Sequence, residues 1–196
     1  MQKYGIVITD ITDINKLDTS KIDYIKLSDH GFTPSLEMYE TIKAHYNVPI
    51  YCVIKHQAKY YNQETIEAMC DSAKTLIANG ADGLVCDFMN SDYSINYLLV
   101  SKLRRYVKDK ALIYELTLDD KCDELKALQE LIVIEVEKVI FKGNLKQYLR
   151  RIAKVYFEYN EVIDMILEAN DHNTLVEASE FTNINNVLYN KETLKS

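Results

Sequence analysis

Short apolar runs alternate with amphipathic stretches along almost the whole chain, and this alternation limits the fold more than any other feature. Several runs, such as residues 49–54, are apolar on both faces, which is typical of parallel strands covered on both sides. The stretches between them, clearest over residues 64–78, place apolar residues on one face of a helix. Seven runs predict strands: residues 4–9, 23–27, 49–55, 83–89, 111–116, 136–142 and 174–178.

This βαβα order predicts parallel strands joined by helical crossovers. We therefore expect one domain over residues 1–196 with an α/β fold, a (β/α) barrel of the TIM type. An open doubly wound sheet is the alternative. It is disfavoured because no glycine-rich phosphate loop follows any predicted strand.

The number of strands depends on residues 162–167, which fit either a helix or a strand. A strand there would be joined to the run at 174–178 by only residues 168–173, too few for a parallel crossover of about a dozen residues. We therefore predict a helix over 162–167 and an incomplete barrel of seven βα units that lacks the eighth strand.

The composition fits a single helix-rich domain. Hydrophobic residues make up 47% of the 196 residues, enough for one sizeable core, while 5 glycines and 2 prolines are too few for an all-β sandwich rich in tight turns. The net charge of −7 is unfavourable for binding nucleic acid. One basic cluster is expected to form a solvated helix face, with an anion or partner site as the alternative; it comprises Lys102, Arg104, Arg105, Lys108 and Lys110.

The cellular compartment is predicted from two features of the sequence. No apolar run approaches the length of about 20 residues that crosses a bilayer, so no membrane contact is expected. The four cysteines are widely spaced and form no CxxC pair, which indicates small buried side chains in a reducing compartment and no disulfide framework. We therefore expect a cytoplasmic protein.

Charged residues recur where the predicted strands end. The chemistry of a barrel takes place at the carboxyl ends of its strands, so these side chains are expected to gather around one opening. Three cations and four anions there can surround a small charged ligand, or they can pair with one another and cap an inactive barrel. Both interpretations stay open. The residues are Asp10, Lys26, Lys55, Asp87, Glu115, Lys142 and Glu177.

Lys142, near the end of the sixth predicted strand, and Glu115, on the fifth, indicate catalysis as an alternative. A lysine amine can attack a carbonyl when desolvation and neighbouring cations lower its pKa, and Lys26 and Lys55 are such cations. A nearby carboxylate can then move the protons. The pair therefore fits a Schiff-base lyase, an aldolase-like barrel enzyme.

Several segments resemble the CutC family of copper homeostasis proteins. Residues 31–35 read Gly-Phe-Thr-Pro-Ser, similar to the family's G-G-x-T-P-S after the second strand. Residues 61–69 resemble its Y-[SN]-D-x-E-x-x-x-M helix start, and residues 131–143 follow the segment that leads into its sixth strand. Residues 186–187 and 191–193 resemble its E-N-V and K/Q-E-T-G, which precede its last strand. The resemblance implies a cytoplasmic (β/α) barrel, often dimeric, linked to copper homeostasis and copper ion binding.

The chain departs from the family where the family's site is expected. The family's R-x-E-L-C corresponds to residues 24–28, with Lys26 for the carboxylate and Ser28 for the cysteine. Its R-P-R-G-G loop becomes Lys-His-Gln-Ala at 55–58, and of its F-H-R-A-F-D only the final acid, Asp119, is kept. We therefore expect a degenerate charged pocket that is non-catalytic or binds a small charged ligand.

Copper, implied by the resemblance, has two candidate ligands. Cu(I) prefers thiolate and thioether, and Cys52 and Cys86 fall on adjacent predicted strands. Side chains alternate along a strand, so if Lys55 and Asp87 point into the barrel, both cysteines point outward beneath the helices. No methionine or histidine is placed to complete a site. Core packing is the favoured role, and the cofactor and metal site stay unknown.

An incomplete barrel has a consequence for assembly. Stopping after seven units leaves the edges of the first and last strands unpaired, which invites association or covering. Fifteen tyrosines supply the amphipathic contact surface that interfaces use. We therefore predict a homodimer, or a gap plugged by the C-terminal tail.

Overall fold

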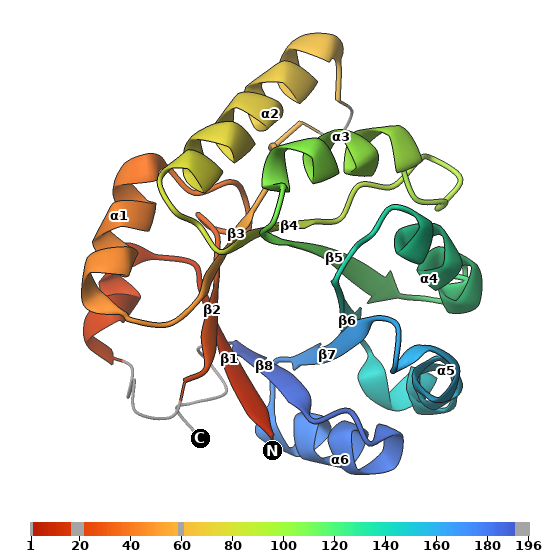
Figure 1. Cartoon of the computed structure of the whole chain (residues 1–196). Coiled ribbons are helices and arrows are strands. Elements are labelled where there is room, and N and C mark those ends of the chain that lie inside the picture. The colour runs from red at the N-terminus through yellow and green to blue at the C-terminus, as the bar shows by residue number, and fades with distance from the viewer. Residues whose placement is uncertain (1, 17–21, 59–60, 191–196) are drawn as a thin grey trace.

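Eight parallel strands close into a barrel in the computed structural model, which describes residues 2–16, 22–58 and 61–190 (Figure 1). Each strand pairs with the next along the chain, and β1 also pairs with β8, so that Lys3 lies opposite Asn186 and Val7 opposite Asn190. The strands are β1 (Lys3–Ile8), β2 (Tyr24–Leu27), β3 (Ile50–Val53), β4 (Gly83–Cys86), β5 (Ala111–Leu118), β6 (Lys138–Gly143), β7 (Asp164–Ala169) and β8 (Asn186–Asn190).

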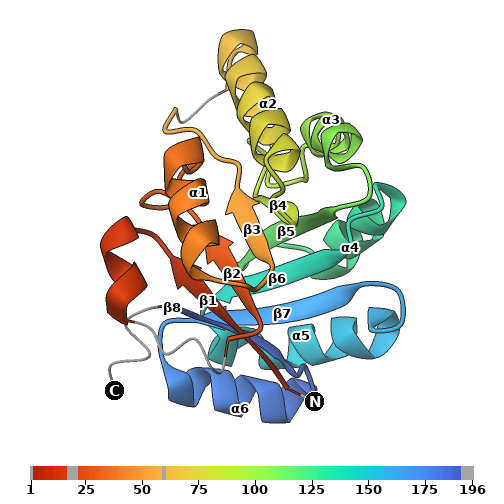
Figure 2. The same cartoon turned by 60° about the vertical axis from the view of Figure 1, so that its left-hand side comes forward.

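The α-helices cover the outside of the barrel (Figure 2). From β2 onward a crossover helix joins each strand to the next, and a 3-10 helix (Ile11–Lys16) follows β1. The α-helices are α1 (Leu36–His45), α2 (Gln63–Ala78), α3 (Tyr97–Val107), α4 (Glu124–Val133), α5 (Leu145–Tyr159) and α6 (His172–Thr182). Among the described residues, no helix combines the length and the apolar character that crossing a membrane requires.

Side-chain caps fix where five of these helices begin, α3 among them through Asn96, whose Oδ1 accepts the N–H of Leu99. In the other four, Ser35, Asn62, Asp123 and Asp171 likewise accept a hydrogen bond from the backbone N–H three residues later. This bond satisfies one of the four N–H groups that the start of a helix leaves without a partner. Asp171 lies two residues beyond the end of β7, so the cap there turns the chain directly from strand to helix.

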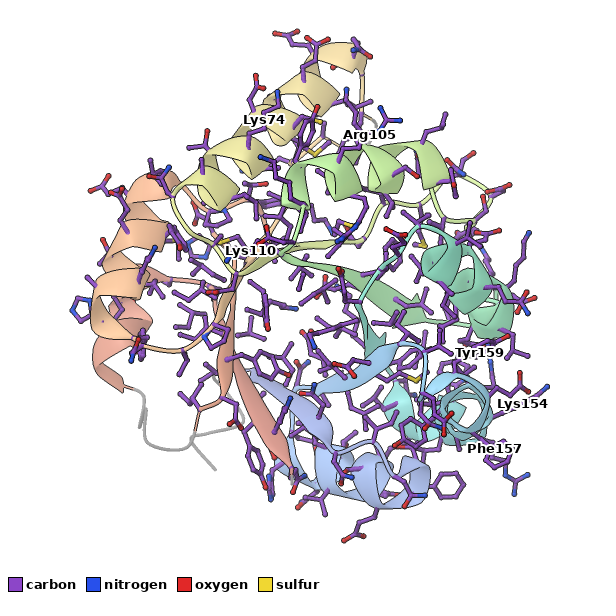
Figure 3. All side chains as sticks on the ribbon, in the orientation of Figure 1. Lys74, Arg105, Lys110, Lys154, Phe157 and Tyr159 are labelled. Atoms are coloured by element: carbon purple, nitrogen blue, oxygen red, sulfur yellow. The ribbon has the colours of Figure 1, made fainter. Side chains whose placement is uncertain are left out.

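The barrel has two apolar layers because successive side chains of a strand point to opposite faces. The outer layer, which includes Ile25, Cys52 and Leu84, packs beneath the helices. The inner layer fills the barrel, and Figure 3 shows side chains occupying the ring of strands. It comprises Val7, Tyr24, Val53, Val85, Ile113, Ile140, Ile166 and Leu188. Burial on both faces explains why the strands read as continuous apolar runs.

Two glycines allow close contacts in this barrel. A Cβ on Gly5 would lie 2.2 Å from the ring of Tyr24, whose hydroxyl donates to Asn186 Oδ1 at 2.9 Å. A Cβ on Gly83 would lie 2.2 Å from the carbonyl oxygen of Ala111 on the neighbouring strand. Neither position has room for a side chain unless its surroundings shift.

The predicted TIM-type barrel is confirmed, but the prediction of seven units was wrong. Residues 162–167, predicted as helix, lead into and lie largely within β7, and residues 174–178, predicted as a strand, lie within α6. β8 follows α6 and completes the barrel. A short apolar run looks alike in a buried strand and in a buried helix, so periodicity does not separate the two at these positions.

Barrel closure removes the basis of the prediction about assembly. β1 pairs with β8 along residues 3–7, so the open edges expected between first and last strands are absent from the described part of the chain. The motif at 191–193 and the C-terminal tail, which was expected as a plug, lie outside the described residues. The homodimer stays a prediction that rests on the tyrosine content and on the family resemblance.

Candidate functional site

Six charged side chains gather at the carboxyl ends of the strands. The strand ends surround one opening of the barrel, which we call the mouth. Each comes two positions after an inner-layer residue, so the alternation of the strand carries it onto the inner face, beyond the apolar layer. The pairs of inner-layer and charged residue are Tyr24 and Lys26, Val53 and Lys55, Val85 and Asp87, Ile113 and Glu115, Ile140 and Lys142, and Ile166 and Glu168. We call these six charged side chains the charged cluster.

Lys26 connects two carboxylates in the middle of this cluster. Its ammonium group donates to Glu115 Oε1 and, at 2.6 Å, to Glu168 Oε2. The second oxygen of Glu115 accepts from Lys142 Nζ at 2.8 Å. Strands β2, β5, β6 and β7 therefore supply one continuous network of two lysines and two glutamates.

The carboxylates of the cluster are less exposed than two of its ammonium groups. Lys55 and Asp87 form a separate pair, with 2.5 Å between Nζ and Oδ2. Side-chain exposure is 36% for Lys55 and 28% for Lys142, against 18% for Asp87, 13% for Glu168 and 7% for Glu115. The charge that the mouth presents to solvent is therefore mainly positive, although the whole chain is acidic.

Burial and charge oppose each other in the network around Lys26. Burial acts to lower the pKa of Lys26, but the carboxylates of Glu115 and Glu168 outweigh it and raise that pKa. Burial acts to raise the pKa of Glu115, but Lys26 and Lys142 lower it to about 2. For Glu168, burial and the charge of Glu115 outweigh the attraction of Lys26, and its pKa is raised. Glu115 is therefore firmly ionised, and Glu168 protonates first as the pH falls.

Five of the seven predicted site residues belong to this cluster. Asp10 follows β1, and its Oδ1 accepts the N–H of Thr12 at the start of the 3-10 helix. Glu177 was expected at a strand end, but its segment is part of α6. There it is exposed and pairs with Lys146 of α5 at 2.8 Å. The placement of Glu177 in the mouth was therefore wrong.

Glu168 is the cluster residue that the sequence interpretation missed. It lies in β7, a segment whose beginning was predicted as helix, and so it was not counted among the strand ends. The signal that identifies it is the one shared by the other five residues, a charged side chain two positions after a buried apolar one. Reading Ile166 as a strand residue would have placed Glu168 in the mouth.

The candidate copper ligands lie outside the mouth. Cys52 and Cys86 belong to the outer layer, on the strand face opposite Lys55 and Asp87. Burial raises the pKa of the Cys52 thiol to about 12, with a smaller contribution from Asp82, and burial also raises that of Cys86. No group of three histidine, cysteine, aspartate or glutamate side chains within residues 2–16, 22–58 and 61–190 is arranged to hold a metal ion.

Comparison with known proteins shows that the sequence is similar to CutC proteins. The CutC family model matches residues 5–179. A CutC family protein of Treponema denticola is 30% identical over 115 residues, 58% of this chain and 47% of that protein. The copper homeostasis protein cutC homolog of Homo sapiens is 26% identical over 119 residues, 60% of this chain and 44% of that protein. The matched stretch thus spans less than half the length of these curated relatives.

Solved structures give the same fold at low sequence identity. CutC from Streptococcus agalactiae superposes with a TM-score of 0.85 and 16% identity, covering 98% of this chain and 100% of that one. KGPDC from Streptococcus mutans has a TM-score of 0.71 and 10% identity, covering 100% of this chain and 91% of that one. At these identities the likeness establishes the barrel and says nothing about the chemistry in its mouth.

Proposed function

Because this chain belongs to the CutC family, we propose that it takes part in copper homeostasis as a barrel whose mouth binds a small anionic ligand. The name of the human relative supports the physiological role. One observation supports the nature of the ligand: Lys55 and Lys142 are the most exposed charges of the cluster, and the carboxylates are less accessible.

The hydrogen-bonding capacity of these two lysines favours an anion. In the described contacts Lys142 donates to Glu115 and Lys55 donates to Asp87, while an ammonium group has three N–H donors. A carboxylate or phosphate group can use further donors without breaking either ion pair. A cation would have to approach two ammonium groups and displace a lysine to reach Glu115. The mouth therefore selects against cations.

A bound copper ion does not fit the described residues. Cu(I) is held by thiolate and thioether groups, whereas Cys52 and Cys86 lie beneath the helices with raised thiol pKa values. We therefore attribute the role in copper homeostasis to the ligand of the mouth, with these two cysteines as packing residues.

Anion binding should depend on Lys142. We expect inorganic phosphate or citrate to bind the wild-type protein saturably in isothermal titration calorimetry. Lys142→Met should weaken binding by about tenfold or more, the scale expected for one hydrogen bond to a charged group. Lys154→Met is the matched control, because Lys154 is an exposed lysine on the outside of α5 (Figure 3).

Two results would contradict this proposal. Equal affinity of the Lys142→Met and Lys154→Met variants would exclude the mouth as the anion site. Retention of Cu(I) by the wild-type protein against a chelator, lost in Cys52→Ala and Cys86→Ala, would assign the copper to the cysteines instead. Circular dichroism of each variant shows whether the fold is kept.

The second candidate function is that of a Schiff-base lyase. One distance favours it, the 2.8 Å between Lys142 Nζ and Glu115 Oε2. The Lys142 amine can add to a ketone and lose water to form a Schiff base, while Glu115 moves the protons. This function ranks second because a carboxyl with a pKa of about 2 is a weak base at neutral pH.

Borohydride reduction tests the Schiff-base function directly. If the chemistry operates, incubation with dihydroxyacetone and borohydride adds a reduced adduct to Lys142, located by peptide mass spectrometry. The Lys142→Met variant should then gain no adduct under the same conditions. An unchanged mass of the wild-type protein across a panel of ketoses would exclude this function.

A further inference from the structure

A cleft of about 340 Å³ lies beside the mouth, between the loop that joins β2 to α1 and the side of α2. Three segments form its walls: the β2–α1 loop with Asp29 and His30, the segment after β3 with Lys55, and α2 with Ala68 and Ser72. Figure 1 shows α1 and α2 as neighbours around the ring, with β3 on their inner side. Lys55 is a residue that the cleft shares with the charged cluster.

Hydrogen bonds hold the loops of this cleft in place. The N–H of Thr33 donates to Lys55 O at 3.0 Å, and the N–H of Lys55 donates to Thr33 Oγ1 at 2.8 Å. Asp29 and Phe32 exchange two backbone hydrogen bonds of 2.9 and 2.8 Å, with His30 between them at a φ of 47°. The walls are therefore largely formed in the free protein, so binding costs little conformational entropy.

The polar lining offers donors to a ligand. Lys55, which pairs with Asp87, is the lysine of the lining. The Nδ1 atom of His56 accepts a backbone N–H at 3.0 Å, so in the neutral ring Nε2 carries the proton and can donate. Asp29 adds an acid, whose carboxylate lies 3.8 Å from His30 Nε2. A cation beside an imidazole N–H donor is a combination that suits a carboxylate.

The lining also has an apolar wall. Phe32, Ala68 and Met69 contribute carbon surface to the same cleft, which is large enough for a small organic molecule. We propose that the cleft binds a small organic acid, with its carboxylate on Lys55 and His56 and its hydrocarbon part against this wall. A bound carboxylate shares the Lys55 ammonium with Asp87 and leaves the existing ion pair intact.

This site goes beyond the function proposed for the mouth, and the two can be tested separately. Lys142 supports anion binding in the mouth, whereas Ser72 of α2 lines only the cleft. The mouth proposal predicts weaker phosphate binding in Lys142→Met, and the cleft proposal predicts weaker benzoate binding in Ser72→Phe, so either prediction can fail while the other holds.

Benzoate is a suitable probe, with benzamide as its neutral counterpart of nearly equal shape. Titration followed by NMR chemical shifts should show saturable binding of benzoate to the wild-type protein. Affinity for benzamide should be lower by about tenfold, because the hydrogen bond to a charged partner is lost. Ser72→Phe should fill the cleft and reduce benzoate affinity by a similar factor.

Thr75→Phe is the matched control for this substitution. Both hydroxyls lie on α2 and donate to the carbonyl oxygen four residues earlier, Ser72 at 3.0 Å and Thr75 at 2.9 Å, but the cleft is lined by Ser72 and not by Thr75. Thr75→Phe should therefore bind benzoate as the wild-type protein does. If Ser72→Phe does not fold, Ala68→Phe, at an exposed position of the same lining, provides a second test and should reduce benzoate affinity in the same way.

Three outcomes would overturn the proposal. They are the absence of saturable benzoate binding up to about 10 mM, equal affinity for benzoate and benzamide, and unchanged benzoate binding in a folded Ser72→Phe variant. If phosphate binding is retained in Ser72→Phe and lost in Lys142→Met, the proposed anion site in the mouth is supported even when the cleft proposal fails.

Discussion

Replacing Glu115 with glutamine should lower the free energy of unfolding by about 3 kcal/mol or more, the range expected when one partner of a buried ion pair is removed. Lys26 would keep Glu168 as its carboxylate partner, but Lys142 would lose the carboxylate it contacts. Glutamine has nearly the volume of glutamate, so the loss reports on charge and not on a cavity. Urea unfolding at neutral pH measures it.

Two further variants serve as comparisons for Glu115→Gln. Glu168→Gln should cost less, because burial already raises the pKa of Glu168 and opposes its ionised form. Asp71→Asn, in the exposed pair with Lys74, should have the smallest effect. A Glu115→Gln variant as stable as Asp71→Asn would mean that the buried network does not stabilise the barrel.

The same carboxylate should make stability fall in acid. Because the folded-state pKa of Glu115 is lowered to about 2, its contribution is complete above its ordinary value of 4.5 and is lost as the pH falls through about 2. Glu168 acts with the opposite sign, since its raised pKa gives a contribution that is present below 4.5 and lost as the pH rises through the folded pKa. The acid loss should therefore be shallower in Glu115→Gln and steeper in Glu168→Gln than in the wild type.

Gly83→Ala should be the other severely destabilising change, by about 3 kcal/mol, at the upper end of what overpacking costs. The added Cβ would lie 2.2 Å from the Ala111 carbonyl oxygen. That oxygen belongs to the backbone of β5, so no side-chain rotation relieves the contact. β4 and β5 would have to move apart, and their hydrogen bonds would weaken. Thermal and urea unfolding both measure the loss.

Gly31→Ala is the control for this prediction. At Gly31 an added Cβ meets nothing within 4 Å, but the residue has a φ of +89°. Its substitution therefore tests backbone strain alone and should cost about 1 kcal/mol. If Gly83→Ala lowers the free energy of unfolding no more than Gly31→Ala does, β4 and β5 can shift apart at little cost. The contact with the Ala111 carbonyl oxygen would then not explain the need for glycine at this position.

Lys26 shows how far the sequence predicts the site. Its place on the inner face follows from alternation after Tyr24, and its position at a strand end follows from the length of the apolar run. Its partners Glu115 and Glu168 are 89 and 142 residues away along the chain. Which charges meet depends on barrel closure and on the register of every strand pair, and no local pattern specifies either.

Glu168 and Glu177 show the opposite case, in which a local ambiguity moved a site residue. The run at 174–178 was predicted as a strand, although it lies in α6. A strand at 162–167 would have been too close to it for a helical crossover between them, so that segment was predicted as a helix. Asp171, whose side chain accepts the N–H of Thr174, marks the start of α6 and is the cue that resolves the ambiguity. With that cap recognised, 172–182 becomes the crossover helix, and β7 and Glu168 follow.

The pairing of β1 with β8 determines when this protein can finish folding as it is made. Lys3 and Asn186 are partners in the sheet, so the first strand has only one neighbour until residues 186–190 have left the ribosome. Until then the nascent chain exposes a row of free backbone hydrogen-bonding groups, which can pair with other chains. Contacts between such distant segments also form slowly. The interval before β8 emerges is therefore when this edge of the sheet is open to pairing with other chains.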